Sequence, residues 1–427
     1  MKPYSEMTKE ELLELKRDLS DQYREFQGKN LTLDMSRGKP SAEQLDLSMG
    51  MMDVLSSDSD LTCEDGTDCR NYGGLDGISE AKELLADMIE VPADNIIIYG
   101  NSSLNVMYDT ISRSVTHGVM GNTPWCKLDK VKFLCPVPGY DRHFSITEYF
   151  GIEMINIPMT ADGPDMDLVE KYVNNDASVK GIWCVPKYSN PQGVVYSDET
   201  VERFSKLKPA ADDFRIFWDN AYTVHHLYDD KQAEIPNILE LCEKEGNPDM
   251  VFEFCSTSKV TFPGAGLAGI CTSEKNREDI KKRLTIQTIG HDKINQLRHA
   301  RFFKDVDGIK AHMAKHAALI RPKFELVENI LTDEIASRGI GTWVKPLGGY
   351  FFGFEALSGC AKEIVAKCKE AGVTMTGAGS PFPYKKDPDD SVIRIAPTYP
   401  SLDELKKAAE VFVVVTRLVS VNKLLEA

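Results

Sequence analysis

The stretch CSTSKVTFPGAG, residues 255–266, places one lysine in a loop of small and hydroxylated residues directly after the apolar run MVFEF. A lysine amine in a desolvated or electropositive pocket loses its proton more readily and becomes a nucleophile that forms imines. Most lysines that follow a strand are instead solvated surface charges. The chemistry available to Lys259 therefore depends on the side chains that gather around it.

Hydroxyl groups near this lysine suit a phosphate. Ser102 and Ser103 follow the apolar run NIIIYG and precede a helical pattern, so that they sit with free backbone N–H groups at a helix N-terminus. Serines are also ordinary helix caps, and this alternative stays open. Ser256 and Ser258 flank Lys259 in its own loop and would add two further hydroxyls.

Other polar residues follow other apolar runs. Tyr140 offers a flat ring that could stack on a planar ligand, and Asn190 precedes a proline in a rigid turn that could aim its amide at an oxygen. Asp219 directly follows the run RIFW, where a buried carboxylate needs a partner, and Tyr222 lies close behind it. Plain turn chemistry, and for Asp219 a helix N-cap, are the alternative roles.

Short apolar runs that alternate with helical patterns must position these side chains. This alternation of strand and helix patterns predicts an α/β fold with a mostly parallel sheet covered by helices. Because ligands bind beyond the carboxyl ends of parallel strands, we expect the polar residues to meet at one edge of the sheet. The runs are NIIIYG, KVKFLCP, GIEMINIP, KGIWCVP, RIFWDNA and MVFEFCS.

The pattern changes near residue 300. Long amphipathic helical periodicity over 306–339 is followed by two strand patterns, GGYFFGFE and VIRIAP, and by a closing helix over 401–427 with Ser401 as its N-cap. These features predict a smaller α+β domain. The predicted division is 1–45 as an N-terminal arm and helix that contribute to the small domain, 46–300 as the large cofactor-binding domain, and 301–427 as the small domain.

The amino-acid composition argues against several classes of function. With 66 acidic and 50 basic side chains in 427 residues, the net charge of −16 disfavours a nucleic-acid partner. The charged start predicts no export signal, and the apolar runs are too short to span a membrane, so a cytoplasmic protein is expected. Ten scattered cysteines suit reduced core thiols. Cys63 and Cys69 lack a second ligand pair at zinc spacing, and we predict no metal site.

Six motifs in order give these residues a family context: YGGLDG at 72–77, GNSS at 100–103, SNPQG at 189–193, DNAY at 219–222, STSK at 256–259 and IRIAP at 393–397. Over nearly its whole length the chain resembles the fold-type I pyridoxal-phosphate-dependent aminotransferases of the class I/II superfamily. The segments SRGKP and DKINQLRH resemble more narrowly the aspartate aminotransferase subgroup related to the catalytic domains of MocR-type regulators.

The resemblance implies roles around pyridoxal 5'-phosphate. Lys259 would hold the cofactor through an imine and then shuttle a proton between substrate and cofactor carbons, and Asp219 would keep the pyridine nitrogen protonated. Asn190 and Tyr222 would hydrogen-bond the phenolic oxygen, and Tyr140 would stack over the ring. The phosphate would be held by four serines, Ser102, Ser103, Ser256 and Ser258.

The resemblance also implies a substrate site and a shared dimer. Arg394 would bind the substrate α-carboxylate with two parallel hydrogen bonds, and the backbone of Gly38 would approach the same group. Tyr72 would reach the phosphate of the neighbouring subunit in a homodimer. The chain departs from many relatives at Leu267, where they carry an arginine for the phosphate. Helix-end N–H groups and serines, or a basic residue from elsewhere, would have to balance that charge.

The sequence gives less information about which amino acid is the substrate. A dicarboxylic substrate needs a second cation, for which Arg37, Lys39 and Lys293 are candidates, and each is equally well explained as a solvated charge. The leading hypothesis is an aspartate:2-oxoglutarate aminotransferase that works by a ping-pong mechanism through a pyridoxamine form. A transaminase for alanine or an aromatic amino acid is the nearest alternative. A non-catalytic regulator that binds the cofactor is the third, and the start of the chain lacks the basic DNA-binding segment of such regulators.

Overall fold

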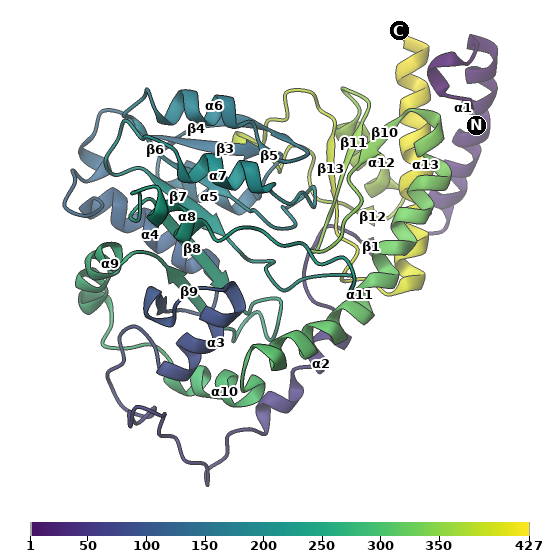
Figure 1. The fold of residues 1–427 in the computed structure, drawn as a ribbon. Helices are drawn as coiled ribbons and strands as arrows, with labels where there is room; N and C mark the ends of the chain where they lie inside the picture. The colour runs from purple at the N-terminus through teal and green to yellow at the C-terminus, as the bar shows by residue number, and fades with distance from the viewer. Residues whose placement is uncertain (1, 427) are drawn as a thin grey trace.

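The computed structural model describes residues 2–426, and its largest element is an eight-stranded sheet. The strands are β2 Ile96–Ile98, β3 Lys132–Val137, β4 Glu153–Thr160, β5 Gly163–Pro164, β6 Val179–Cys184, β7 Arg215–Asp219, β8 Val251–Ser256 and β9 Ala268–Cys271. Their order across the sheet is β2-β9-β8-β7-β6-β3-β4-β5 (Figure 1). The five central strands from β8 to β4 are parallel, and β9, β2 and β5 add antiparallel edges.

The six apolar runs predicted as strands all form strands of this sheet, and the predicted mostly parallel arrangement is confirmed. Every residue of β6, β7 and β8 is buried, as expected for parallel strands covered on both faces. β9 was not predicted, because Ala268 and Gly269, two of its four residues, are small and give little strand signal.

Helices cover both faces of the sheet. Phe217 packs in a core with residues of α4, α5 and α9, whereas its neighbour Trp218 packs on the other face with residues of α6, α7 and α8. Because side chains alternate along a strand, Asp219 lies on the face of Phe217. The helices around the sheet are α3 Ser79–Ile89, α4 Ser103–His117, α5 Asp141–Tyr149, α6 Met166–Val173, α7 Asp198–Ser205, α8 Ile238–Lys244, α9 Glu274–Gln287 and α10 Lys293–Phe303.

A smaller group of elements packs beside the large sheet. It comprises α1 Lys9–Gly28, β1 Leu33–Asp34, α11 Val306–Glu334, β10 Gly341–Trp343, β11 Phe352–Ala356, α12 Ala361–Glu370, β12 Val373–Thr374, β13 Val392–Ile395 and α13 Leu402–Glu426. β10, β11 and β13 form an antiparallel sheet, and β1 pairs with β12. Figure 1 shows α1 and α13 side by side, so both ends of the chain lie in this group.

Local signals account for several element ends. The predicted N-cap of the closing helix is confirmed, because the backbone N–H of Glu404 donates to Ser401 Oγ at 3.3 Å. The stretch 56–74 contains a single isolated bridge and no helix or strand, so it is a long loop. The remaining short elements are η1 Tyr4–Glu6, α2 Ala42–Asp46, η2 Met49–Met52, η3 Ala93–Asn95, η4 Trp125–Lys127, η5 Ala336–Arg338 and η6 Pro383–Lys385.

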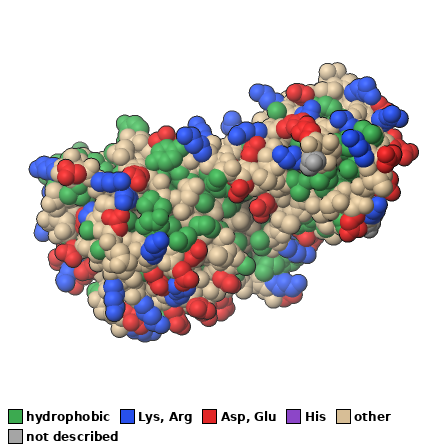
Figure 2. All heavy atoms as spheres, turned by 90° about the horizontal axis from the view of Figure 1, so that it is seen from above, with side chains coloured by type: hydrophobic (Ala, Val, Ile, Leu, Met, Phe, Trp, Pro, Cys, Tyr) green, Lys and Arg blue, Asp and Glu red, His purple; other side chains and the backbone are tan. Residues whose placement is uncertain are grey.

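The surface carries mixed charge. Figure 2 shows acidic and basic side chains interspersed over the face seen from above, with no single basic stripe on that face. Within residues 2–426, none of the helices combines the length and the apolarity that a membrane crossing requires. All cysteines except Cys126 are buried, as predicted for core thiols, and all are unpaired.

Candidate active site

Lys259 lies three residues beyond the end of β8, in the turn 257–260. Its side-chain nitrogen is 4.9 Å from the ring centre of Tyr222 and 5.8 Å from that of Tyr350. Two aromatic faces therefore hold the amine by cation–π attraction at the carboxyl edge of the sheet. Tyr222 was expected here, whereas Tyr350, which comes from the loop before β11, was not singled out from the sequence.

Asp219 ends β7 and is 3% exposed. Its Oδ2 lies 2.9 Å from His143 Nε2, whereas its Oδ1 is buried and has no hydrogen-bond partner in the described part of the chain. The alternative role as a helix N-cap is wrong, because a turn rather than a helix follows the strand. Buried polar atoms normally have a hydrogen-bond partner, so Asp219 Oδ1, at the edge of the sheet where ligands bind, needs a donor from outside the chain.

His143 was missed by sequence reasoning. It lies on α5, and its ring stacks on Trp183 with centroids 4.4 Å apart and planes 10° apart. Tyr140 meets the same imidazole edge-on at 4.9 Å. The imidazole is thereby fixed in position against Asp219. Its only signal in the sequence was its place three residues after Tyr140.

Two tyrosine hydroxyls of this site keep their protons. Burial raises the pKa of Tyr140 to about 12, although the nearby charge of Lys259 opposes the shift. Burial also raises the pKa of Tyr222, with the charge of Asp219 adding to the effect. Both hydroxyls are therefore available as hydrogen-bond donors in neutral solution.

The predicted phosphate-binding serines come from two adjacent segments. Ser102 caps α4, accepting from Asn105 N at 3.4 Å, and Ser103 is buried in the first turn. In the lysine loop, Ser256 Oγ donates to Ser258 Oγ at 3.2 Å. Asn101 joins the two segments, since its amide donates to Gly264 O at 3.2 Å. The structure thus brings a helix N-terminus next to the lysine loop.

Leu267, which stands where many relatives carry an arginine, is buried. Its side chain belongs to a core that includes residues of α3 and α10, and its backbone N–H donates to Thr257 Oγ1 at 2.8 Å. This position therefore supports the shape of the lysine loop and supplies no positive charge.

Arg394 projects from β13 toward the same edge. Its Nη1 lies 3.0 Å from Asp141 Oδ1 and 3.5 Å from Asn190 Oδ1, and its guanidinium lies 4.8 Å from the ring centre of Phe351. The structure brings the predicted pair Arg394 and Asn190 together. The ion pair with Asp141, at the start of α5, was not foreseen, because nothing in the sequence links residues so far apart.

Gly38 lies against the same aromatic ring. A Cβ built on it would be 2.1 Å from Phe351 Cζ, so no side chain fits there. The same ring lies against Arg394, so Gly38 and Arg394 share a neighbour, whereas the approach of the Gly38 backbone to a substrate carboxylate stays a prediction. Arg37 points outward, with Asp34 as its ion-pair partner at 4.0 Å, and Lys39 Nζ lies 3.8 Å from the ring centre of Tyr399.

Lys293 is buried, so the alternative of a solvated charge is wrong for this residue. Its Nζ donates to Asn71 O at 2.6 Å and to Gly73 O at 2.8 Å. These bonds brace the loop that carries Tyr72, whose own side chain is 79% exposed. Within this chain, Lys293 therefore stabilises the loop that carries Tyr72.

Comparison with known proteins places this geometry in context. Residues 7–427 match the family model described as "Aspartate amino-transferase". An aspartate aminotransferase of Corynebacterium glutamicum is 46% identical over 92% of this chain and 90% of its own length. The crystal structure of an aspartate transaminase from the same species has a TM-score of 0.96 at 43% identity, covering 98% of this chain and 99% of that one.

A more distant structure shares the fold alone. It is an α-aminoadipate aminotransferase from Thermus thermophilus, complexed with N-(5'-phosphopyridoxyl)-L-leucine, with a TM-score of 0.71 at 18% identity, covering 92% of this chain and 93% of that one. These matches confirm the predicted fold class, fold-type I, and the predicted class of enzyme, an aminotransferase. The chain therefore belongs to the aspartate aminotransferase family.

Proposed function

We propose that this aminotransferase exchanges amino groups between aspartate and 2-oxoglutarate with pyridoxal 5'-phosphate as its cofactor. The observation that carries the proposal is the buried Oδ1 of Asp219, which lacks a donor on the ligand edge where Lys259 also lies. A protonated pyridine nitrogen supplies that missing donor. The aspartate aminotransferase of C. glutamicum, 46% identical, supports the choice of substrate.

Asp219 and Lys259 have the central roles in this proposal. When bound, the cofactor supplies an electron-withdrawing ring that stabilises negative charge at the substrate α-carbon. Asp219 holds the proton on the ring nitrogen, and His143, hydrogen-bonded to Oδ2, orients the carboxylate. The amine of Lys259 would hold the cofactor covalently and, when free, would move the proton at the substrate α-carbon.

Polar groups around the ring would fix the cofactor. Asn190 and Tyr222 hydrogen-bond its phenolic oxygen, and Tyr140 packs against the ring in this proposal. The four serines already described hold the phosphate, together with the N-terminus of α4. No cation stands at Leu267, so these neutral donors and Tyr72 of the partner subunit replace the usual arginine.

Arg394 is the proposed ligand of the substrate α-carboxylate. Its guanidinium carbon lies 4.8 Å from the ring centre of Phe351, and the group is already paired with Asp141, so it is oriented before substrate arrives. An incoming carboxylate competes with Asp141 for the same nitrogen. Gly38 lets the backbone approach this group, and Arg37 or Lys39 remains the candidate for the side-chain carboxylate.

We also propose a homodimer with shared active sites, because the family resemblance assigns Tyr72 to the neighbouring subunit's phosphate and Tyr72, 79% exposed, is accessible to a second subunit. Light scattering should give twice the mass of the chain. Mixing inactive Lys259→Ala and Tyr72→Ala proteins and exchanging their subunits should restore about a quarter of the wild-type sites. No recovery, or a monomer in solution, contradicts the sharing of sites.

An absorbance spectrum with candidate donors tests the function. The purified protein should absorb in the visible, and aspartate should bleach that band, whereas alanine and aromatic amino acids should leave it unchanged. Lys259→Ala is the control, because it should lose the covalent link and nearly all turnover. Bleaching by alanine or an aromatic amino acid alone would favour the alternative substrates. No bleaching by any donor would favour a regulator that binds the cofactor without turnover.

A further inference from the structure

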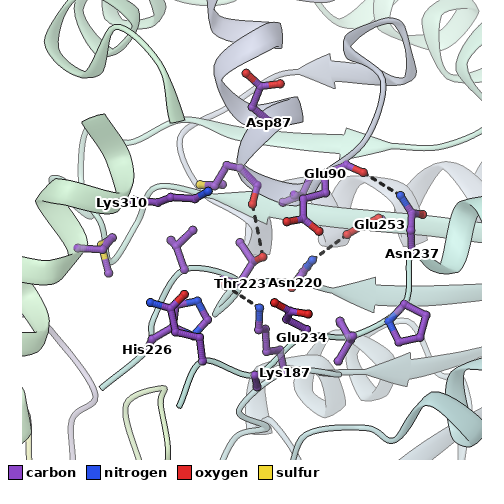
Figure 3. Close-up of a pocket in the computed structure, with 18 of the residues that line it drawn as sticks. Asp87, Glu90, Lys187, Asn220, Thr223, His226, Glu234, Asn237, Glu253 and Lys310 are labelled. Atoms are coloured by element: carbon purple, nitrogen blue, oxygen red, sulfur yellow. Dashed lines mark hydrogen bonds between the residues drawn. The ribbon is translucent and has the colours of Figure 1, made fainter. Parts of the chain in front are cut away.

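A second cavity lies across the large sheet from Asp219. Its volume is about 410 Å³, within the range of roughly 300–1,000 Å³ that is usual for small-molecule sites. Trp218, Asn220 and Glu253 line it from β7 and β8, and residues of α3, α11 and the segment 229–238 close its other sides (Figure 3). Because side chains alternate along a strand, these residues face away from Asp219.

Glu253 is the unusual residue of this cavity. It is 3% exposed, and its Oε1 accepts a hydrogen bond from Asn220 Nδ2 at 2.9 Å. Among the described residues, no lysine, arginine or histidine forms an ion pair with it, and its Oε2 receives no hydrogen bond. A buried carboxylate without a positive partner is costly. Accordingly, burial raises the pKa of Glu253 to about 7.

The lysines that line the cavity do not supply the missing charge. Lys187 is buried and donates to Thr223 O at 3.0 Å. Glu90 and Glu234 lie near enough to counter the lowering of the Lys187 pKa that burial causes. Lys310 projects from α11 and is exposed. Figure 3 shows Lys187 and Lys310 approaching the cavity from different sides, while Glu253 is paired with the amide of Asn220 alone.

Asn220 holds only one carboxylate oxygen of Glu253, Oε1, and leaves Oε2 for a ligand. Asn220 is 6% exposed, and its own Oδ1 has almost no accessible surface and receives no hydrogen bond from the described residues. Residues 2–426 contain no cluster of three or more histidine, cysteine, aspartate or glutamate side chains suited to a metal ion. We propose that this cavity binds a small organic cation, an ammonium or guanidinium compound, whose charged head donates hydrogen bonds to the carboxylate of Glu253.

The surrounding charges favour such a cation. Burial lowers the pKa of His226 to about 4, so its ring is neutral and does not repel a cation at neutral pH. Around Glu253 the acidic groups outnumber the basic ones. The titratable side chains that line the cavity with it are Asp87 of α3, Glu90 directly after that helix, Lys187, His226, Asp229 and Glu234 of the loops, and Lys310 of α11.

Titration calorimetry on the purified, cofactor-loaded protein tests the proposal without requiring turnover. The probe is n-propylguanidinium, which has no primary amine to react with an aldehyde, and its neutral isostere is n-propylurea. The guanidinium should bind and the urea should not. Because Glu253 ionises near pH 7, affinity should be about tenfold higher at pH 8 than at pH 6.

Variants locate the binding. Glu253→Gln keeps the size and the acceptor for Asn220 but removes the charge, so it should weaken guanidinium binding at least tenfold. Glu243→Gln removes an exposed charge of α8 that lies outside the cavity and should leave binding unchanged. Absence of guanidinium binding to the wild type, equal binding of the urea, unchanged affinity in Glu253→Gln, or displacement by saturating succinate at the candidate active site would each overturn the proposal.

Discussion

Removing the charge of Glu253 should change how the stability of the protein depends on pH. The pKa of this carboxyl is raised from its ordinary value of 4.5 to about 7 by burial. Between these two values the folded protein binds a proton that the unfolded chain releases. The contribution of Glu253 is therefore fully present below pH 4.5 and is lost as pH rises through 7. Glu253→Gln cannot ionise and loses nothing over this range.

The size of the effect follows from the pKa. At about 1.4 kcal/mol per unit, the shift corresponds to about 3 kcal/mol of unfolding free energy. For a chain of 427 residues, this is about 3 to 4 °C in melting temperature. The assay compares urea and thermal unfolding of the wild type and Glu253→Gln from pH 4.5 to pH 8, in buffers free of amines and guanidinium so that the cavity stays empty.

The wild type should lose stability relative to Glu253→Gln as pH rises, with most of the change between pH 5 and pH 7.5. Glu243→Gln, which removes an exposed charge, should run parallel to the wild type. A constant difference between the wild type and Glu253→Gln across the range would refute the inference that Glu253 is buried without a positive partner.

Three further predictions concern the active site. His143→Phe keeps a ring to stack on Trp183 but removes the hydrogen bond to Asp219. Since hydrogen bonds to charged groups contribute about 1.5–3 kcal/mol, kcat should fall tenfold or more while the protein stays folded. An unchanged kcat in steady-state assays contradicts the role of His143 in orienting Asp219. Arg394→Lys loses the planar pair of donors, and KM for aspartate should rise at least tenfold, with the rise shared by other amino acids because the α-carboxylate is common to them. A rise confined to aspartate would place Arg394 at the side-chain carboxylate instead. Gly38→Ala should bring its new methyl group against Phe351 and lower kcat/KM, whereas Gly28→Ala, which meets no neighbour, should have no such effect.

Strong local patterns made most of the fold predictable. Six apolar runs gave six strands of the large sheet, and hydroxyls before an amphipathic pattern gave the caps at Ser102 and Ser401. Because parallel strands end at one edge, the same reading brought Lys259 and Asp219 to one place. The division into residues 1–45, 46–300 and 301–427, the MocR relationship and the cytoplasmic location stay predictions.

What sequence reasoning missed depends on contacts between distant segments. The roles of His143 and Asp141 can be recognised only in the fold, where α5 places His143 against Asp219 and Asp141 against Arg394. Both partners follow much later in the chain. Lys293 looks like an ordinary surface charge until its carbonyl partners are seen. Glu253 sits within an apolar run, where a single acid gives no hint of whether a cation faces it in the fold.

Reduction with borohydride, followed by peptide mapping, tests the central claim most directly. The proposal predicts that the purified protein carries a phosphopyridoxyl group on one peptide, with the added mass on Lys259. Lys259→Ala treated in the same way should carry none. Labelling of a different lysine, or no labelling of wild-type protein that retains its visible absorbance, would contradict the assignment of Lys259 as the residue that holds the cofactor.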